Sequence, residues 1–232
     1  MAPQVGAHCL ERAAGGRGVL MGGVSGVYAA KVVVLGAGVS GLNAAAIALG
    51  MQAQVLLLDK NVDRLREVDR IYQGHMQTVT SNTYEIERAV LDADLVIGAV
   101  LVPGAKAPML ISDDLVGRMK QGSVLVDISV DQGGCFESTR PTTHSDPTFE
   151  VNGSLFYCVA NMPGAVPNTS TYALTNVTLP YAVEIADRGL RTAVEADAAL
   201  ALGVHTVGGQ LTYASVAEAH GLQSVPWSEV LA

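Results

Sequence analysis

From residue 31 onward, apolar and polar positions along the chain alternate between two patterns. Short, nearly unbroken runs of aliphatic residues indicate buried strands, and the stretches between them carry apolar residues at helical spacing. Between Val62 and Tyr72, for example, Val62, Leu65, Val68 and Ile71 recur every three residues, with charged residues between them. This alternation predicts a parallel sheet whose strands are joined by crossover helices.

Turn and capping residues set the bounds of the expected elements. Asn82, followed by Glu85 three positions later, forms a capping-box pattern that opens one helix, and Gly122 ends another. We expect strands at Val32–Gly36, Ala53–Asp59, Gln77–Thr80, Asp94–Val100, Ser123–Ser129 and Leu155–Asn161, and helices at Leu42–Gly50, Val62–Tyr72, Asn82–Leu91 and Ser112–Met119. A polar loop rich in Pro, Thr and Gly should precede the last strand. The fold class is therefore predicted to be α/β, with a Rossmann-type doubly wound parallel sheet.

The flanks of this sheet differ from it. Residues 1–30 are expected to form a connecting helix and a glycine-rich linker, because GGRGVLMGGVSGV would lose much chain entropy on ordering alone. The sheet would occupy residues 31–167. Residues 168–232 should be mostly helical, broken near Pro180 and Gly189, and they are too few for a core of their own. We interpret them as flanking helices that belong to an incomplete second domain.

Composition excludes several classes of protein. The 232 residues are 49% hydrophobic and 16% charged, so the chain can bury enough apolar surface to fold, which excludes disorder. A formal net charge of -8, without any cluster of Lys or Arg, argues against a nucleic-acid partner.

Membrane insertion and secretion are also disfavoured. Val32 to Leu58 is uncharged and long enough to span a bilayer, but its glycines and polar residues divide it into strand, helix and strand. No signal-peptide pattern begins the chain, and its three cysteines are widely spaced. They fit reduced thiols better than disulfides or a metal site, so we expect a cytoplasmic protein without a metal.

A glycine motif is the first feature that indicates chemistry. Gly36, Gly38 and Gly41 form G-x-G-x-x-G between the first strand and its helix. The first glycine permits the tight turn, the second lets the backbone approach a pyrophosphate, and the third allows close helix packing. Asp59 ends the next strand, where its carboxylate would accept hydrogen bonds from both hydroxyls of an adenosine ribose. The motif predicts dinucleotide binding, and Asp59 favours NAD because it would repel the 2′-phosphate of NADP.

Two residues near this motif leave alternatives open. Arg64 could receive a 2′-phosphate, although a helix-face charge whose stem covers the adenine is the plainer interpretation. The other strand ends should also face the cofactor, and Asp131 lies at one of them beside a Gly-Gly turn. That position suits proton transfer near a nicotinamide, but an aspartate there could equally cap the turn through its own backbone. None of the five histidines is well placed as a base, and no base or cation can be named that would activate Cys135.

Five strings identify a resemblance. VVVLGAGVSGLNAA, DLVIGAVLVPGAKAP, VLVDISVDQGGCFE, RPTTHSDPTF and LFYCVANMPGAVPNTSTYALTN closely resemble, in this order, the NAD domain of the bacterial alanine dehydrogenase family. The related NAD-binding component of proton-translocating transhydrogenase shares the fold and the glycines. Its usual counterpart to Asp131 and the Gly-Gly turn carries a glutamate and an asparagine instead.

The resemblance implies reversible oxidative deamination of L-alanine to pyruvate and ammonia with NAD as cofactor. It also implies a role for each matching residue. The expected set is Gly36, Gly38 and Gly41 at the pyrophosphate, Asp59 and Arg64 at the adenosine end, Ser81 and Val100 near the adenine and ribose, Val159, Asn161 and Met162 around the nicotinamide, and Asp131 as catalytic aspartate beside the reacting carbon. Val39, Leu101, Ile128 and Asp131 complete the expected cofactor-binding residues.

The resemblance also implies that the substrate domain of the family is missing from this sequence. In the family, a substrate domain precedes the cofactor domain and supplies an arginine, a lysine and an acid/base histidine, and no residue here matches these three. Residues 31–167 would thus be the NAD-binding domain, and residues 168–232 a remnant of the substrate domain. The alternatives are a catalytically incomplete NAD-binding module and the transhydrogenase component. Family members are commonly hexamers, so a homo-oligomer is expected.

Overall fold

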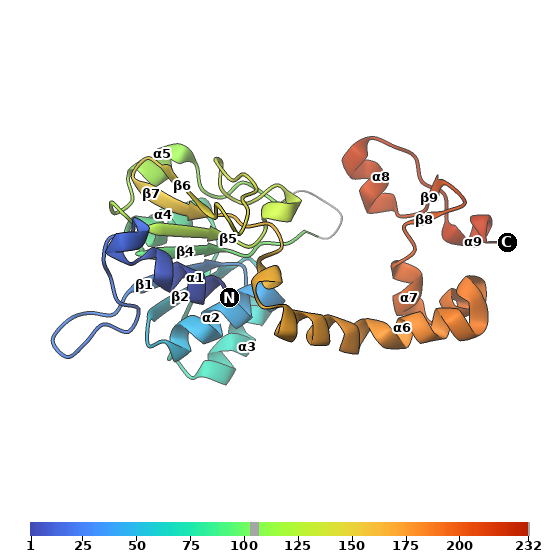
Figure 1. Ribbon diagram of the computed structural model, residues 1–232, viewed down its shortest axis with the longest axis horizontal. Helices are drawn as coiled ribbons and strands as arrows, with labels where there is room; N and C mark the ends of the chain where they lie inside the picture. The colour runs from blue at the N-terminus through green and yellow to red at the C-terminus, as the bar shows by residue number, and fades with distance from the viewer. Residues whose placement is uncertain (103–106, 232) are drawn as a thin grey trace. The chain divides into compact units, whose positions relative to one another are not determined.

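A computed structural model describes residues 1–102 and 107–231 (Figure 1). Outside residues 102–106, the chain divides into two compact units, one from Met1 to Met162 and the other from Pro163 onward. The first unit contains all of the residues that the sequence assigns to a cofactor site.

The first unit is built on a seven-stranded sheet in the order β3-β2-β1-β4-β5-β7-β6 (Figure 1). The parallel strands are β1 (Lys31–Leu35), β2 (Gln54–Asp59), β3 (Gln77–Thr80), β4 (Leu95–Gly98), β5 (Val124–Asp127) and β7 (Ser154–Tyr157), and β6 (Thr148–Val151) pairs antiparallel with β7. The strand order reverses direction between β1 and β4, the place where ligands bind in open α/β sheets. The predicted Rossmann-type doubly wound sheet is therefore confirmed.

Helices cover both faces of this sheet, which explains the continuous apolar runs in its strands. In β1, Val32 and Val34 belong to one core with α1 (Ala2–Cys9), α2 (Val39–Gly50) and α3 (Val62–Tyr72). Val33 and Leu35 point to the opposite face and pack with α4 (Thr83–Leu91) and α5 (Asp113–Gly117). Because side chains alternate along a strand, one apolar run supplies both cores.

The helix caps agree with the sequence. Asn82 accepts a hydrogen bond from the Glu85 amide at 2.9 Å and Ser112 from the Leu115 amide at 3.3 Å, so each caps the helix that it was expected to open. Asn61, which was not singled out, caps α3 by accepting from the amides of Asp63 and Arg64. Capping side chains thus satisfy donors that the first turn of each helix leaves free.

The expected loop before the last strand was wrong in part, because β6 lies within it. Strands β6 and β7 are joined by Asn152 and Gly153, whose φ angles of 48° and 82° are both left-handed. Two such residues are typical of the type I′ hairpin turn, and Asn-Gly is its commonest sequence. Phe149 of β6 packs on Phe156 of β7 with ring centroids 5.3 Å apart. Asn152-Gly153 therefore indicates a hairpin in the sequence, although the polar composition of the segment favoured a loop.

The N-terminal segment is ordered by packing on the sheet. Helix α1 contacts α2, β4 and β5, and Leu10 is fully buried. Met21 and Ala30 are also buried, so parts of the glycine-rich stretch join the first core. Burial against the sheet offsets the entropy that these glycines lose.

The second unit is mainly helical. Its elements are α6 (Pro167–Ala196), α7 (Ala198–Leu202), β8 (Thr206–Val207), β9 (Gln210–Leu211), α8 (Ala214–His220) and α9 (Trp227–Val230). Gly189 has a φ of 75° and breaks α6 as expected, whereas Pro180 lies inside the helix without leaving helical geometry. Among the described residues, no helix is both long and apolar enough to cross a membrane.

Helix α6 exposes many apolar side chains within its unit. Leu174, Val177 and Leu179 are 60–62% exposed, and the buried residues of the helix are Ala193 and Val194. Exposed apolar surface promotes association or binding to partners.

We predict that the chain binds a hydrophobic dye and self-associates through this helix. Replacing Leu174, Val177 and Leu179 with Gln should lower dye fluorescence severalfold and shift light scattering toward the monomer, because Gln keeps helix propensity while removing apolar surface. Gln at Thr171, Thr175 and Thr178 is the matched control. Equal dye binding by both triple variants would contradict the prediction.

Candidate functional site

The carboxyl ends of the parallel strands bring most of the predicted residues to one edge of the sheet. Gly36 follows β1, Asp59 ends β2, Ser81 follows β3 and Ile128 follows β5, while Val100 and Val159 lie two residues beyond β4 and β7. Hydrogen bonds join these ends: Gly36 N donates to Leu58 O at 2.7 Å, Ser81 N to Asp59 O at 2.9 Å, and Ile128 N to Gly98 O at 2.8 Å. These bonds join the end of β1 to β2, of β2 to β3 and of β4 to β5, so the predicted residues there lie at neighbouring strand ends.

The glycine turn between β1 and α2 is shaped by close backbone contacts. Gly36 has a φ of 103°, and a Cβ there would lie 2.7 Å from Ala99 O. A Cβ on Gly41 would lie 1.8 Å from Gly36 O, so the helix could not approach the strand with any larger residue. At Gly38 the nearest atom to such a Cβ is Arg64 Nη1 at 3.6 Å, which leaves the turn open on that side.

The first turn of α2 is suited to an anion. Gly38 is its N-cap and no side chain caps it, and Val39 is 82% exposed. Uncapped amides at a helix N-terminus carry a partial positive charge and donate to phosphate oxygens. The backbone of this turn could therefore hold a pyrophosphate.

Asp59 is fixed beside the same turn. Its Oδ2 accepts from Ala37 N at 2.6 Å and its Oδ1 from Asn61 N at 2.7 Å. Each carboxylate oxygen has a second lone pair, so both can accept further hydrogen bonds from a ligand hydroxyl. Arg64 Nη1 donates to Ala37 O at 3.4 Å, which places the guanidinium over the glycine turn.

Asp131 lies in a short 3₁₀ turn, Val130–Gln132, after β5. Its side chain is exposed, and within residues 1–102 and 107–231 no backbone amide donates to its carboxylate. The alternative in which Asp131 caps its own turn therefore has no hydrogen bond to support it. The turn is held instead by Asp127, which the sequence interpretation treated as one more residue of a buried strand.

Three residues that the resemblance places around the nicotinamide follow β7. Val159 and Met162 are buried, and Asn161 is exposed with a left-handed φ of 57°. Asn161 O lies 3.2 Å from Nε2 of His144, which supports this backbone conformation. Leu101 is exposed beyond β4, and Pro103, two residues further along the chain, lies outside the described residues.

Cys135 and Cys158 are buried near Asp127. Burial, and secondarily the Asp127 carboxylate, raise the pKa of the Cys135 thiol well above its usual value and that of Cys158 to about 12. A thiol held protonated is a poor nucleophile, in agreement with the expectation from sequence.

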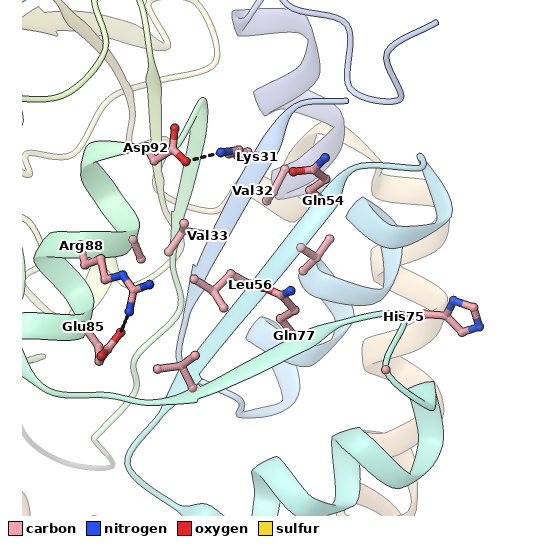
Figure 2. Close-up of a pocket in the computed structure, with 14 residues that line it drawn as sticks. Lys31, Val32, Val33, Gln54, Leu56, His75, Gln77, Glu85, Arg88 and Asp92 are labelled. Atoms are coloured by element: carbon pink, nitrogen blue, oxygen red, sulfur yellow. Dashed lines mark hydrogen bonds and ion pairs between the residues drawn. The ribbon is translucent and has the colours of Figure 1, made fainter. Parts of the chain in front are cut away.

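A cavity of about 490 Å³ lies between α4 and the face of β1, β2 and β3, and it extends to the ends where these strands begin (Figure 2). Its lining includes Lys31 and Gln77 at the starts of β1 and β3, and Glu85, Arg88 and Asp92 around α4. The charges are paired, Lys31 with Asp92 and Arg88 with Glu85, and hydrogen bonds from Lys120 and Lys31 lower the pKa of Asp92. The cavity shares no residue with the strand-end site.

Comparison with known proteins shows the family. Residues 2–214 match the family described as "Alanine dehydrogenase/PNT, C-terminal domain". The chain belongs to this family. The alanine dehydrogenase of Mycobacterium tuberculosis (strain ATCC 25618 / H37Rv) is 58% identical over 232 residues, which is 100% of this chain and 62% of the relative. That of Geobacillus stearothermophilus is 51% identical over 99% of this chain and 61% of its own length.

Among solved structures, an L-alanine dehydrogenase is more similar to this chain than a transhydrogenase is. An L-alanine dehydrogenase superposes with a TM-score of 0.87 at 51% identity, covering 95% of this chain and 61% of that one. The transhydrogenase from Sinorhizobium meliloti gives 0.58 at 28% identity, covering 71% and 49%. The chain thus spans about three fifths of the alanine dehydrogenases it matches.

The reactivity of the buried thiols tests whether the three cysteines are structural. We expect the native chain to react with a thiol reagent such as DTNB at pH 8 at least 100-fold more slowly than the unfolded chain, because burial raises the pKa of Cys9 to about 11 and that of Cys158 to about 12. Unfolding in guanidinium should release three equivalents, one for each cysteine. Fast labelling of native Cys135 would contradict the assignment of these thiols as structural.

Proposed function

We propose that the chain is the cofactor-binding part of an NAD-dependent alanine dehydrogenase. The observation that carries the proposal is the junction of the glycine turn, the uncapped start of α2 and the anchored Asp59 carboxylate, in a member of this family. Such a junction suits a dinucleotide, with phosphates at the helix and a ribose at the carboxylate.

The residues present fit NAD better than NADP. Asp59 can accept from ribose hydroxyls but would repel a 2′-phosphate. Arg64, over the glycine turn, is placed to stabilise negative charge at the pyrophosphate rather than to replace Asp59. Ser81, Val100 and Leu101 would flank the adenine and ribose, and Ile128, Val159, Asn161 and Met162 the nicotinamide.

The reaction proposed is L-alanine, NAD+ and water giving pyruvate, ammonium, NADH and a proton. When bound, NAD+ supplies the hydride acceptor. Asp131 is exposed and free of backbone hydrogen bonds among the described residues, so its carboxylate can hold or move a proton beside the reacting carbon. Burial of Cys135 leaves no thiol to compete for this role.

The comparisons favour this function over the transhydrogenase component. Identity and TM-score are both higher for alanine dehydrogenase, and this chain carries Asp131 with the Gly133-Gly134 turn. We propose further that the protein assembles as a homo-oligomer, as a hexamer by resemblance. The chain spans 62% of the Mycobacterium tuberculosis relative. By resemblance, alanine turnover also uses an arginine, a lysine and a histidine of the substrate domain.

The cofactor assignment predicts the effect of Asp59→Ala. Loss of charge-assisted hydrogen bonds to the ribose should weaken NAD+ binding at least tenfold by titration calorimetry, or about 1.4 kcal/mol. Asp63→Ala is the matched control, since that carboxylate makes an exposed ion pair with Arg66 on α3. If Asp59→Ala bound NAD+ with unchanged affinity, the assignment of Asp59 to the adenosine ribose would be wrong.

The catalytic assignment predicts a different effect for Asp131→Asn. In a protein that joins this chain to a substrate domain like that of its relatives, NAD+ affinity should stay within twofold while L-alanine-dependent NADH formation falls about 100-fold or more. The chain of 232 residues alone should bind NAD+ without turnover. Glu150→Gln, at an exposed position on β6, is the control. Full activity of Asp131→Asn would exclude Asp131 from proton transfer.

A further inference from the structure

Asp127 is the last residue of β5 and its side chain is fully buried. One carboxylate oxygen, Oδ1, accepts from Ser129 N at 2.8 Å, and the other, Oδ2, accepts from Cys135 N at 2.9 Å. These two amides stand at the start and end of the turn that carries Asp131. A single carboxylate therefore closes both ends of that turn.

Two further donors come from the same segment. Thr139 Oγ1 donates to Oδ2 at 2.6 Å, and Cys135 Sγ lies 3.7 Å from Oδ1. Within the described part of the chain, no Lys, Arg or His forms an ion pair with Asp127. A buried carboxylate without a cation is stabilised only by its hydrogen bonds, so this segment cannot move away without a large cost.

Close packing fixes the turn from the other side. Gly134 has a φ of 74°, and a Cβ there would lie 2.2 Å from Thr139 Cγ2 and 2.8 Å from Asp127 Oδ2. A Cβ on Gly98 of β4 would lie 2.2 Å from Cys135 Sγ. Ser129 Oγ donates to Val100 O at 2.7 Å, which joins the turn to the end of β4. The turn is thus clamped between Asp127 and the neighbouring strand.

We infer that Asp127 is a positioning residue that fixes the Asp131 turn on the nicotinamide side of the site. Asp127 is fully buried and its carboxylate accepts from backbone amides of the turn, whereas Asp131 is exposed on the turn that Asp127 closes. The inference rests on the proposed function for the ligand that the turn faces, but the clamping itself concerns only this chain.

The clamping is tested by amide hydrogen exchange in Asp127→Asn. The side-chain amide keeps the volume but replaces one acceptor oxygen with a donor, so one of the two backbone amides loses its partner. Exchange at Ser129 or Cys135 should become at least tenfold faster. Asp94→Asn is the matched control, because Asp94 is also buried and accepts from Lys31 N at 2.8 Å, but at the opposite end of the sheet. Unchanged exchange at both amides in Asp127→Asn would overturn the inference.

Comparing the affinities of Asp127→Asn for ADP and for NAD+ separates loss of positioning of the turn from general destabilisation of the protein. ADP probes the glycine turn and Asp59 alone, whereas NAD+ also reaches the Asp131 turn. In Asp127→Asn, NAD+ affinity should fall at least fivefold while ADP affinity stays within twofold. Equal loss for both ligands would overturn the inference. If the unaltered chain binds neither ligand, the proposed function fails, and the exchange rates alone decide whether Asp127 holds the turn.

Thr139 gives a second variant should Asp127→Asn fail to fold. Thr139→Val keeps the shape of the side chain and removes the hydroxyl donor, whereas Thr139→Ser keeps the donor. Thr139→Val should increase exchange at Cys135 and weaken NAD+ binding two- to fivefold, and Thr139→Ser should match the unaltered chain. Identical behaviour of the Val and Ser variants would exclude a role for the hydrogen bond to Asp127.

Discussion

Parallel pairing of strands that are buried on both faces is the constraint on which the first unit depends. Each strand must be apolar at successive positions, as in Val32 to Leu35, because neighbouring side chains enter different cores. Crossover helices then return the chain to the same starting edge. Every parallel strand consequently ends at the opposite edge, where the apolar pattern stops and turns begin.

The site is a direct consequence of that arrangement. Turns follow the strand ends at this edge, and the strand order reverses between β1 and β4, the place where ligands bind in open α/β sheets. Close approach of β1, α2 and the end of β4 demands glycine at Gly36 and Gly41, as the contacts with Ala99 O and Gly36 O show. The features that make the turn compact also leave the amides of α2 free for an anion.

The two buried aspartates of the sheet also lie where strands start or stop. Asp127 and Asp94 are buried at opposite edges of the sheet, and each is satisfied by backbone amides or paired groups where the strands start or stop. Burial of a carboxylate is tolerated there because the surrounding segment supplies donors. Asp127 thereby converts a flexible Gly-Gly turn into a defined support for Asp131.

The sequence by itself determined the strands and helices of the sheet, the caps at Asn82 and Ser112, and the row of candidate residues from Gly36 to Met162. These follow from local periodicity and from residues whose backbone preferences are strong. It did not reveal β6, the continuity of α6 through Pro180 or the role of Asp127, since neither composition nor spacing shows which distant donors a buried carboxylate meets. Only the tertiary structure shows what holds the turn that carries Asp131, because the donors of that turn, Ser129, Cys135 and Thr139, meet the Asp127 carboxylate through space.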